Sequence, residues 1–343
     1  MSADKLYLYF FSGTGNARQT ALWMQEEASC KGWETISYEL GRDMGLPPVP
    51  EEGAMVGFIS PTHGFHFPAI MRRFIRRFPR AMKGRAFVMN TRAGLRIGKV
   101  FLPGLSGLVH VVSALVLRLK GYSIVGLQPV DLPSNWISIH PAVRMTGVKL
   151  MHERLEPKVK RFTGEILEGK RRYKALVSLP FDVAIIPIAL GYLLVGRFFL
   201  AKTFFASHSC DNCGLCIESC AVGAIKEKEG RMFWTWRCES CMKCMNICPQ
   251  QAIQTPHGFV ALIIKASYIV FGLLLLRLPW LATKGIATLV ISVIMILVLY
   301  LVYRGMHYLL RFRAIERLMV WTSLSWLPFW GRYHARKLKN KKP

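Results

Sequence analysis

Apolar positions in the first third of the chain fall into short runs that alternate with amphipathic stretches. Five runs rich in β-branched and aromatic residues predict strands near 5–11, 34–40, 54–60, 85–91 and 122–128. Helical spacing fills the intervals, as in 68–80, where Ile70, Phe74 and Phe78 recur every four residues. This alternation predicts an α/β fold, a doubly wound parallel sheet, within a first domain of residues 1–170.

The last third of the chain is apolar over lengths that suit a membrane. Residues 285–303 form a stretch of nineteen residues without a charge, which as a helix would be about 28 Å long. Residues 259–276 are also apolar apart from Lys265. These stretches predict a transmembrane helical hairpin over 258–303, followed by a basic, aromatic tail at the membrane interface over 304–343.

Eight of the nine cysteines form two copies of one spacing, Cys210-x2-Cys213-x2-Cys216-x3-Cys220 and Cys238-x2-Cys241-x2-Cys244-x3-Cys248. Three thiolates at i, i+3 and i+6 can wrap one iron–sulfur cubane, and the fourth then reaches the other cubane. The spacing predicts one [4Fe–4S] cluster on Cys210, Cys213, Cys216 and Cys248. It predicts a second cluster on Cys238, Cys241, Cys244 and Cys220.

Two other uses of the cysteines fit poorly. A disulfide framework usually accompanies a secretory signal peptide, whereas this N-terminus leads into a strand-like run. Zinc sites usually take two separated pairs of ligands, which leaves no use for the third cysteine of each run. Ile225 and Ile253, each five positions after the last cysteine of a run, are expected to shield the sulfurs. The stretch 208–256 resembles a bacterial two-cluster ferredoxin, with Ala221 in place of the usual proline.

A second candidate site follows the first predicted strand, where Ser12-Gly13-Thr14-Gly15-Asn16 opens a helix. Backbone N–H groups and hydroxyls at a helix N-terminus can bind a phosphate. The loop lacks the Gly-Lys-Ser/Thr ending of a P-loop, and Arg18 stands where a dinucleotide fingerprint has its third glycine.

Aromatic, amide and hydroxyl side chains follow the later strands, where ligands bind in such sheets. They are Pro61, Thr62, His63, Gly64 and Phe65, then Asn90, Thr91, Arg92 and Gly94, then Trp136. With the first loop they resemble a flavodoxin over about 5–150. The resemblance implies FMN, with its phosphate on Ser12, Thr14, Gly15 and Asn16. It also implies that 61–65 and 90–94 frame the isoalloxazine ring and that Trp136 stacks on it. Ala17 and Arg18 depart from this pattern, and a sheet that has lost its flavin is the alternative.

The order of the two domains, with the ferredoxin domain over 207–257, resembles the flavodoxin–ferredoxin fusion proteins of anaerobic bacteria and archaea. Clusters and flavin are assembled inside the cell, so we expect both domains on the cytoplasmic face of a multi-pass inner-membrane protein. A single crossing by the apolar residues 175–198 would separate flavin from clusters by about 30 Å. We therefore expect 171–206 to be an interfacial or re-entrant segment, and 101–119 to be a helix pressed onto lipid or onto 175–198.

The charge of the chain bears on its partners. The formal net charge is +26, and residues 53–130 contain twelve Lys or Arg but no acidic residue. Residues 304–343 contain ten Lys or Arg and a single acidic residue, Glu316. This excess of positive charge agrees with a cytoplasmic tail. No nucleic-acid module is evident, so anionic lipid is the favoured partner, with an acidic electron carrier as another.

These features predict a membrane-anchored protein that passes electrons between two [4Fe–4S] clusters and FMN, to or from a partner redox enzyme. The alternative is an FMN-dependent reductase of a membrane-phase acceptor such as a quinone. A cluster-based oxygen sensor would need signalling modules that the sequence does not show. The sequence leaves open whether the protein is itself an enzyme and in which direction electrons flow.

Overall fold

The computed structural model describes residues 4–42, 47–82, 84–97, 100–263, 265–266, 269 and 285–333. The chain divides into two compact units. The first is built from the described parts of 1–135, 142–190 and 333–343, and the second from those of 136–141 and 191–332. Each unit is considered by itself.

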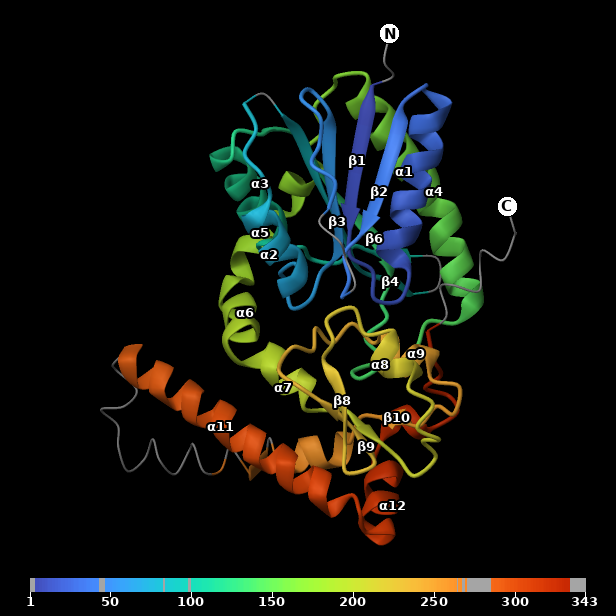
Figure 1. Cartoon of the computed structure of the whole chain (residues 1–343), viewed down its shortest axis with the longest axis vertical. Helices are drawn as coiled ribbons and strands as arrows, with labels where there is room; N and C mark the ends of the chain where they lie inside the picture. The colour runs from blue at the N-terminus through green and yellow to red at the C-terminus, as the bar shows by residue number, and fades with distance from the viewer. Residues whose placement is uncertain are drawn as a thin grey trace. The chain divides into compact units, whose positions relative to one another are not determined.

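The first unit contains a parallel sheet in the order β2-β1-β3-β4-β6 (Figure 1). Its strands are β1 Lys5–Phe10, β2 Glu34–Glu39, β3 Met55–Pro61, β4 Arg85–Ile97 and β6 Ser123–Pro133. All five predicted strands are therefore present. Counted along the parallel strands this is the order 2-1-3-4-5 of the flavodoxin-like doubly wound fold. That order places ligand-binding loops at the carboxyl ends of the strands.

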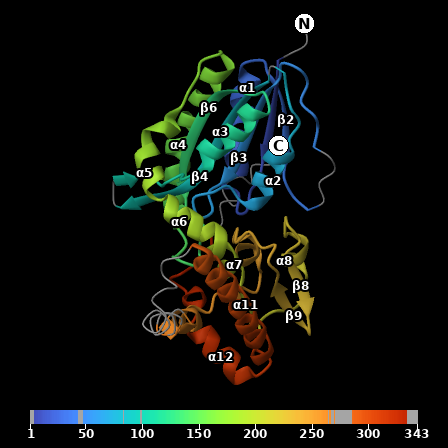
Figure 2. The same ribbon diagram turned by 90° about the vertical axis from the view of Figure 1, so that its left-hand side faces the viewer.

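Helices cover both faces of this sheet. α1 Asn16–Cys30 and α4 Met145–Leu167 pack together on one face. α2 Ala69–Arg77 and α3 Val109–Leu119 cover the other face, which is turned toward the viewer in Figure 2. The side chains of β1 alternate between the faces: Leu6 and Leu8 enter the core beneath α1 and α4, while Tyr9 packs on the aromatic rings beside α2. This alternation follows from the two-residue period of a strand.

Strands β4 and β6 extend beyond their predicted ends. Residues 90–94, expected in a ligand-binding loop, instead continue β4 and pair with β6 through Gly94 and Pro133. Farther on, β4 pairs with the antiparallel strand β5 Val100–Leu102. A Cβ atom at Gly94 would lie 2.7 Å from the carbonyl oxygen of Asp131. The glycine is thus explained by the close approach of β6, without a ligand.

The segment after α4 returns to the sheet edge. Arg172 exchanges backbone hydrogen bonds with β6, donating to Val125 and accepting from Leu127. The 3₁₀ turn η1 Lys174–Ser178 and the short helices α5 Leu179–Ala184 and α6 Ile186–Gly191 follow.

The second unit holds two pairs of short strands. β7 Phe205–Ala206 pairs with β10 Ile253–Gln254, and β8 Ile225–Lys228 pairs with β9 Arg231–Trp234, all antiparallel. Short helices α8 Leu215–Glu218 and α9 Lys243–Ile247 lie within the two cysteine runs. The π-helical turn η2 Tyr192–Gly196 and α7 Arg197–Ala201 lead into the unit.

Helix α11, Gly285–Leu309, is longer than the predicted span and only partly free of protein contacts. Its last turns pack within the second unit, to which α11 belongs, and there Tyr303, Met306 and Leu310 join Phe233 in one buried cluster. α12 Arg313–Trp321 and the turn η4 Leu324–Trp326 follow. Trp321, Trp326 and Phe329 are exposed, whereas Trp330 is buried and donates its indole N–H to the carbonyl of Ile137.

Across the described ranges, no single helix is both long and apolar enough to span a membrane. One bent pair, Lys174–Ala184 and Ile186–Leu200, meets the length and hydropathy requirement when taken together, with a bend of 78°. It coincides with the segment expected to be interfacial or re-entrant. Most of the predicted first hairpin helix, 259–276, and the turn after it lie outside the described residues.

Candidate iron–sulfur and flavin sites

The two cysteine runs have the same backbone conformation at equivalent positions. Asn212 and Ser240, each one residue before the second cysteine of a run, both have positive φ. Gly214 and Met242, one residue after it, are also left-handed and begin α8 and α9. Non-glycine residues rarely adopt this conformation, and it concentrates at functional sites. The runs therefore form a structural repeat as well as a sequence repeat.

The fold brings the eight cysteines together in crossed groups. Cys248, from the second run, interacts electrostatically with Cys210 and Cys216 of the first run. Cys220, from the first run, interacts likewise with the second run's own cysteines, Cys241 and Cys244 among them. These are the same two sets of four that the spacing predicts for two clusters.

Burial disfavours the ionised form of these cysteines. It raises the pKa of Cys216 and of Cys241 to about 11 and holds the pKa of Cys244 well above its usual range. Neighbouring cysteines raise these pKa values further by like-charge repulsion. Bound iron supplies the positive charge that would favour the thiolate form.

Hydrogen-bond donors point at the sulfurs in the same repeated way. The backbone N–H of Ala224 donates to Cys220 Sγ at 3.2 Å, and that of Ala252 donates to Cys248 Sγ at 3.4 Å. The indole N–H of Trp234 is buried without a nitrogen or oxygen acceptor, and it favours the thiolate of Cys244. Such N–H groups are the means by which proteins hold and tune cluster sulfurs.

The residues present therefore fit two iron–sulfur clusters. Ile225 and Ile253, the expected shielding residues, are both buried. Within the described ranges, no group of three or more His, Cys, Asp or Glu side chains is arranged to hold a single metal ion. Each cysteine of a four-iron cluster binds a different iron atom, so its cysteines stand farther apart than the ligands of one ion.

In the first unit, the loop expected to bind a phosphate joins β1 to α1. Ser12 Oγ accepts hydrogen bonds from the backbone N–H groups of Gly15 and Arg18, at 3.2 and 3.3 Å. Gly13, Thr14 and Gly15 are partly exposed, and Thr14 accepts a hydrogen bond from Asn135. This part of the loop offers hydroxyl and backbone donors at the positive end of α1.

Asn16 is less available than the sequence suggests. Its Nδ2 donates to the carbonyl of Pro133 at 2.9 Å, and its Oδ1 accepts from the hydroxyl of Tyr333 at 2.6 Å. Tyr333 is 1% exposed. Both ends of the Asn16 amide are thus occupied by protein groups, and one of them comes from the far end of the chain.

The residues expected to frame a flavin ring fall into two classes. The turn after β3 is accessible, since Pro61, Thr62, Gly64 and Phe65 are partly exposed; His63 is buried and pairs with His66 through their backbones. Asn90, Thr91 and Arg92 are buried. The 61–65 turn is therefore accessible to a ring, whereas the side chains of 90–92 lie beneath the surface.

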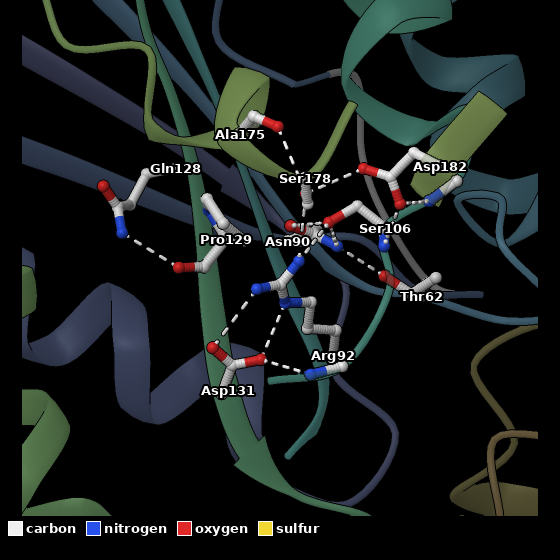
Figure 3. Close-up of polar contacts among 12 residues, drawn as sticks. Thr62, Asn90, Arg92, Ser106, Gln128, Pro129, Asp131, Ala175, Ser178 and Asp182 are labelled. Atoms are coloured by element: carbon white, nitrogen blue, oxygen red, sulfur yellow. Dashed lines mark hydrogen bonds and ion pairs between the residues drawn. The ribbon is translucent and has the colours of Figure 1, made fainter. Parts of the chain in front are cut away.

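Arg92 is held in a buried polar network, shown in Figure 3. Its guanidinium donates to both carboxylate oxygens of Asp131, at 2.7 and 3.3 Å, and to Ser106 Oγ at 3.3 Å. Asn90 donates to Thr62 Oγ1 at 2.6 Å and accepts from His110 Nε2. Burial, with Arg92 nearby, lowers the pKa of His110 to about 3, so this histidine is neutral.

Asp182 ties the segment after α4 to the same network. Its Oδ1 accepts the backbone N–H groups of Ser106 and Gly107 at 2.9 and 2.7 Å, and Oδ2 accepts Ser178 Oγ at 2.9 Å (Figure 3). Sequence reasoning missed this cluster. One signal was available, since Asp182 is the one acidic residue in the apolar run 175–198. A carboxylate buried in such a run requires hydrogen-bond partners.

Trp136, predicted to stack on a flavin, belongs to the second unit. Its indole N–H donates to the carbonyl of Ser240 at 2.9 Å, beside Cys241. Its ring lies 6.2 Å from that of Tyr192. The indole N–H of Trp136 is therefore bonded to the second cysteine run of its own unit.

Comparison with known proteins agrees with the cysteine geometry. Residues 209–253 match the family of 4Fe-4S dicluster domains. This part of the chain is thus similar to iron–sulfur domains of the dicluster type. No curated protein matches the chain.

Solved structures similar to the chain include several flavodoxins. A flavodoxin from the Archaea is 16% identical with a TM-score of 0.30, covering 47% of this chain and 99% of its own. Flavodoxin 1 from Bacillus cereus is 16% identical with a TM-score of 0.34, covering 48% and 98%. The flavodiiron protein of Giardia intestinalis is 13% identical with a TM-score of 0.28, covering 47% and 37%. The strand order, and not these distant likenesses, assigns the fold of the first unit.

Proposed function

We propose that this protein carries electrons through two [4Fe–4S] clusters and an FMN, to or from a partner redox enzyme. The observation that supports this most strongly is the crossed grouping of the cysteines, Cys248 with the first run and Cys220 with the second. Iron–sulfur clusters exchange single electrons, whereas a flavin can take one or two. The chain's own part is to hold these groups, exclude water from the sulfurs and direct N–H groups at them.

FMN is the less strongly supported of the cofactors. The β1–α1 loop fits a phosphate through the partly exposed Gly13 and Thr14, since the N–H of Gly15 already donates to Ser12 Oγ. The 61–65 turn fits the edge of a flat ring. Asn16 and Arg92 do not fit as direct ligands, because their side chains are bonded to other protein groups. The proposed FMN site therefore consists of the loop and the turn alone.

Paired cysteine substitutions test the cluster assignment. In anaerobically purified protein, Cys210→Ser/Cys248→Ser removes two ligands of one predicted set and is expected to leave about four irons and one cluster signal. Cys210→Ser/Cys220→Ser removes one ligand from each set and is expected to weaken both clusters. Cys30→Ser, at an exposed cysteine outside the runs, is the control and should keep about eight irons. Equal iron loss in the two double variants would refute the crossed assignment.

We also propose that the protein is anchored at the cytoplasmic face of a membrane. Each unit carries exposed apolar side chains that favour this: Val177, Phe181 and Leu119 in the first, and Leu301, Trp321 and Phe329 in the second. The basic helix α2 adds arginines in a stretch of sequence, 53–130, that contains no acidic residue. Each basic residue near the surface favours anionic lipid by about 1 kcal/mol. The expected multi-pass topology, with both units facing the cytoplasm, is part of this proposal.

Flotation with lipid vesicles tests the anchoring. The purified chain should rise with vesicles containing anionic lipid and should stay bound at high salt, since a hydrophobic anchor is not screened. Trp321→Glu/Phe329→Glu should weaken the interfacial part, whereas Glu153→Gln on the exposed face of α4 should not. Flotation that is abolished by salt alone would favour a purely electrostatic surface contact.

One observation favours a second candidate, a reductase of a membrane-phase acceptor such as a quinone. A cleft of about 610 Å³ lies beside the first cysteine run and is lined by Ser209, Pro249, Arg317, Trp321 and Trp326, among others. Indoles can stack on a flat ring. Quenching of tryptophan fluorescence by a water-soluble quinone, lost in Trp321→Ala but kept in Phe329→Ala, would support this candidate. Unchanged quenching in Trp321→Ala would exclude the cleft.

A further inference from the structure

Lys202 lies in a cage of aromatic rings within the second unit. Its Nζ is 4.6 Å from the ring centres of both Trp236 and Tyr303, and 5.0 Å from that of Phe233. A fourth ring, Tyr300, lies at 5.8 Å. The side chain is 6% exposed, and its Nζ donates to the backbone carbonyl of Trp234.

A buried ammonium of this kind is unusual because it has no anionic partner. Within the part of the chain that the structure describes, Lys202 forms no ion pair with a carboxylate. Cation–π contacts return part of the cost of removing an ammonium from water. The desolvation cost of a lone charge is larger than that. A negative charge nearby would therefore be needed to keep the buried Lys202 side chain protonated.

The cysteines of the second predicted set supply the place for that charge. Cys238 interacts electrostatically with Lys202 and raises its pKa, while burial lowers that pKa to about 8. Trp234, whose carbonyl binds Lys202, also directs its indole N–H to Cys244. Tyr303 holds the cage in place. Its hydroxyl accepts a hydrogen bond from the backbone N–H of Trp234 at 3.1 Å and donates one to the Phe204 carbonyl at 3.2 Å.

We propose that the caged Lys202 ammonium is the fixed counter-charge of the cluster held by Cys238, Cys241, Cys244 and Cys220, and that it raises the reduction potential of this cluster. Adding an electron makes the cluster more negative, and a nearby buried cation stabilises that state. The cage keeps water out and the ammonium in place, so the effect is only weakly screened by salt. This proposal rests on the clusters of the proposed function.

The test is an anaerobic redox titration of the full-length protein in detergent, followed by electron paramagnetic resonance, with iron content measured on the same samples. Lys202→Met removes the charge and keeps most of the length. It should lower the equilibrium constant for reducing one cluster at least tenfold, about 59 mV for one electron, and leave the other unchanged. Lys202→Arg keeps the charge and should stay within threefold of the unmodified protein.

Lys228→Met is the matched control. Its Nζ lies 4.9 Å from the same Phe233 ring, but the side chain is only partly buried, so its removal should change the equilibrium constant less than threefold. An unchanged midpoint in Lys202→Met with full iron would overturn the proposal, as would an equal shift of both clusters.

A variant that loses iron is also informative. If Lys202→Met and Lys202→Gln lose one cluster while Lys202→Arg keeps it, the charge is required to hold that cluster, which supports the proposal. If Lys202→Arg loses it equally, the residue acts through packing, and the proposal fails. Absence of iron from the unmodified protein would instead refute the proposed function.

Discussion

Replacing Asp182 by alanine tests whether the apolar segment after α4 is fixed to the flavodoxin-like unit. Asp182 is 4% exposed and accepts the backbone N–H groups of Ser106 and Gly107 together with the Ser178 hydroxyl. The substitution would leave the two N–H groups buried without an acceptor. A segment lying loosely in lipid would not depend on this carboxylate.

The expected cost follows from those bonds. An unsatisfied buried donor costs about 1–3 kcal/mol, and bonds to a charged acceptor stand at the upper end. Water entering the space left by the carboxylate returns part of this, so Asp182→Ala should destabilise the local structure by about 3 kcal/mol. At about 1.4 kcal/mol per factor of ten, the N–H groups of Ser106 and Gly107 should exchange with solvent roughly a hundredfold faster.

Hydrogen exchange with mass spectrometry, on peptides covering 101–110 and 174–190, measures this. Asp182→Asn retains the oxygen that accepts both N–H groups and should cost about 1 kcal/mol. Glu153→Ala is the control, because this glutamate is exposed and its 3.8 Å ion pair with Lys149 is worth little. Equal exchange in Asp182→Ala and the unmodified protein would refute the anchoring role of the carboxylate.

Two further outcomes follow from buried side chains of the first unit. Tyr333→Phe removes the hydroxyl that donates to Asn16 Oδ1 but leaves Asn16 Nδ2 on the Pro133 carbonyl. FMN affinity in a flavin fluorescence titration should therefore stay nearly unchanged, and a several-fold change would show that Asn16 takes part in the site. Burial lowers the pKa of His152 to about 4, so below about pH 6.5 the unfolded state binds a proton that the native state does not. The free energy of unfolding should therefore fall as the pH drops from about 6.5 toward 4, by up to about 1.4 kcal/mol per pH unit. His152→Phe, which keeps the edge contact with Trp23, should flatten this slope in urea unfolding at pH 7.5 and 5; parallel slopes would contradict it.

The parallel strands of the first unit and the cysteine runs of the second were predictable because their signals are local. A strand buried on one or both faces needs apolar side chains at short spacing, so the five parallel strands could be located within a few residues. The cysteine spacing likewise predicts the crossed sets, because an i, i+3, i+6 arrangement limits which sulfurs can meet.

The composition of the flavin site was harder to predict because its contacts join distant parts of the chain. The ends of β4 and β6 are set by mutual pairing, which buries Asn90 and Arg92 inside a strand and removes them from the predicted loop. Trp136 follows a strand, as a ring-stacking residue would, yet it belongs to the second unit, where its indole N–H donates to the carbonyl of Ser240. Position after a strand therefore indicated a ligand-binding edge without indicating which side chains face it.

The sequence by itself determined the two classes of unit, the eight cysteines and the apolar segments, because strand period, ligand spacing and hydropathy each depend on neighbouring residues. Only the tertiary structure decided that the Tyr333 hydroxyl donates to Asn16 and that the Asp182 carboxylate accepts the N–H of Ser106. It alone also decided that the Lys202 ammonium is surrounded by four aromatic rings. Each of these depends on which groups are excluded from water together. A buried polar group takes its partner from whatever the fold brings within reach, however far away it lies in the chain.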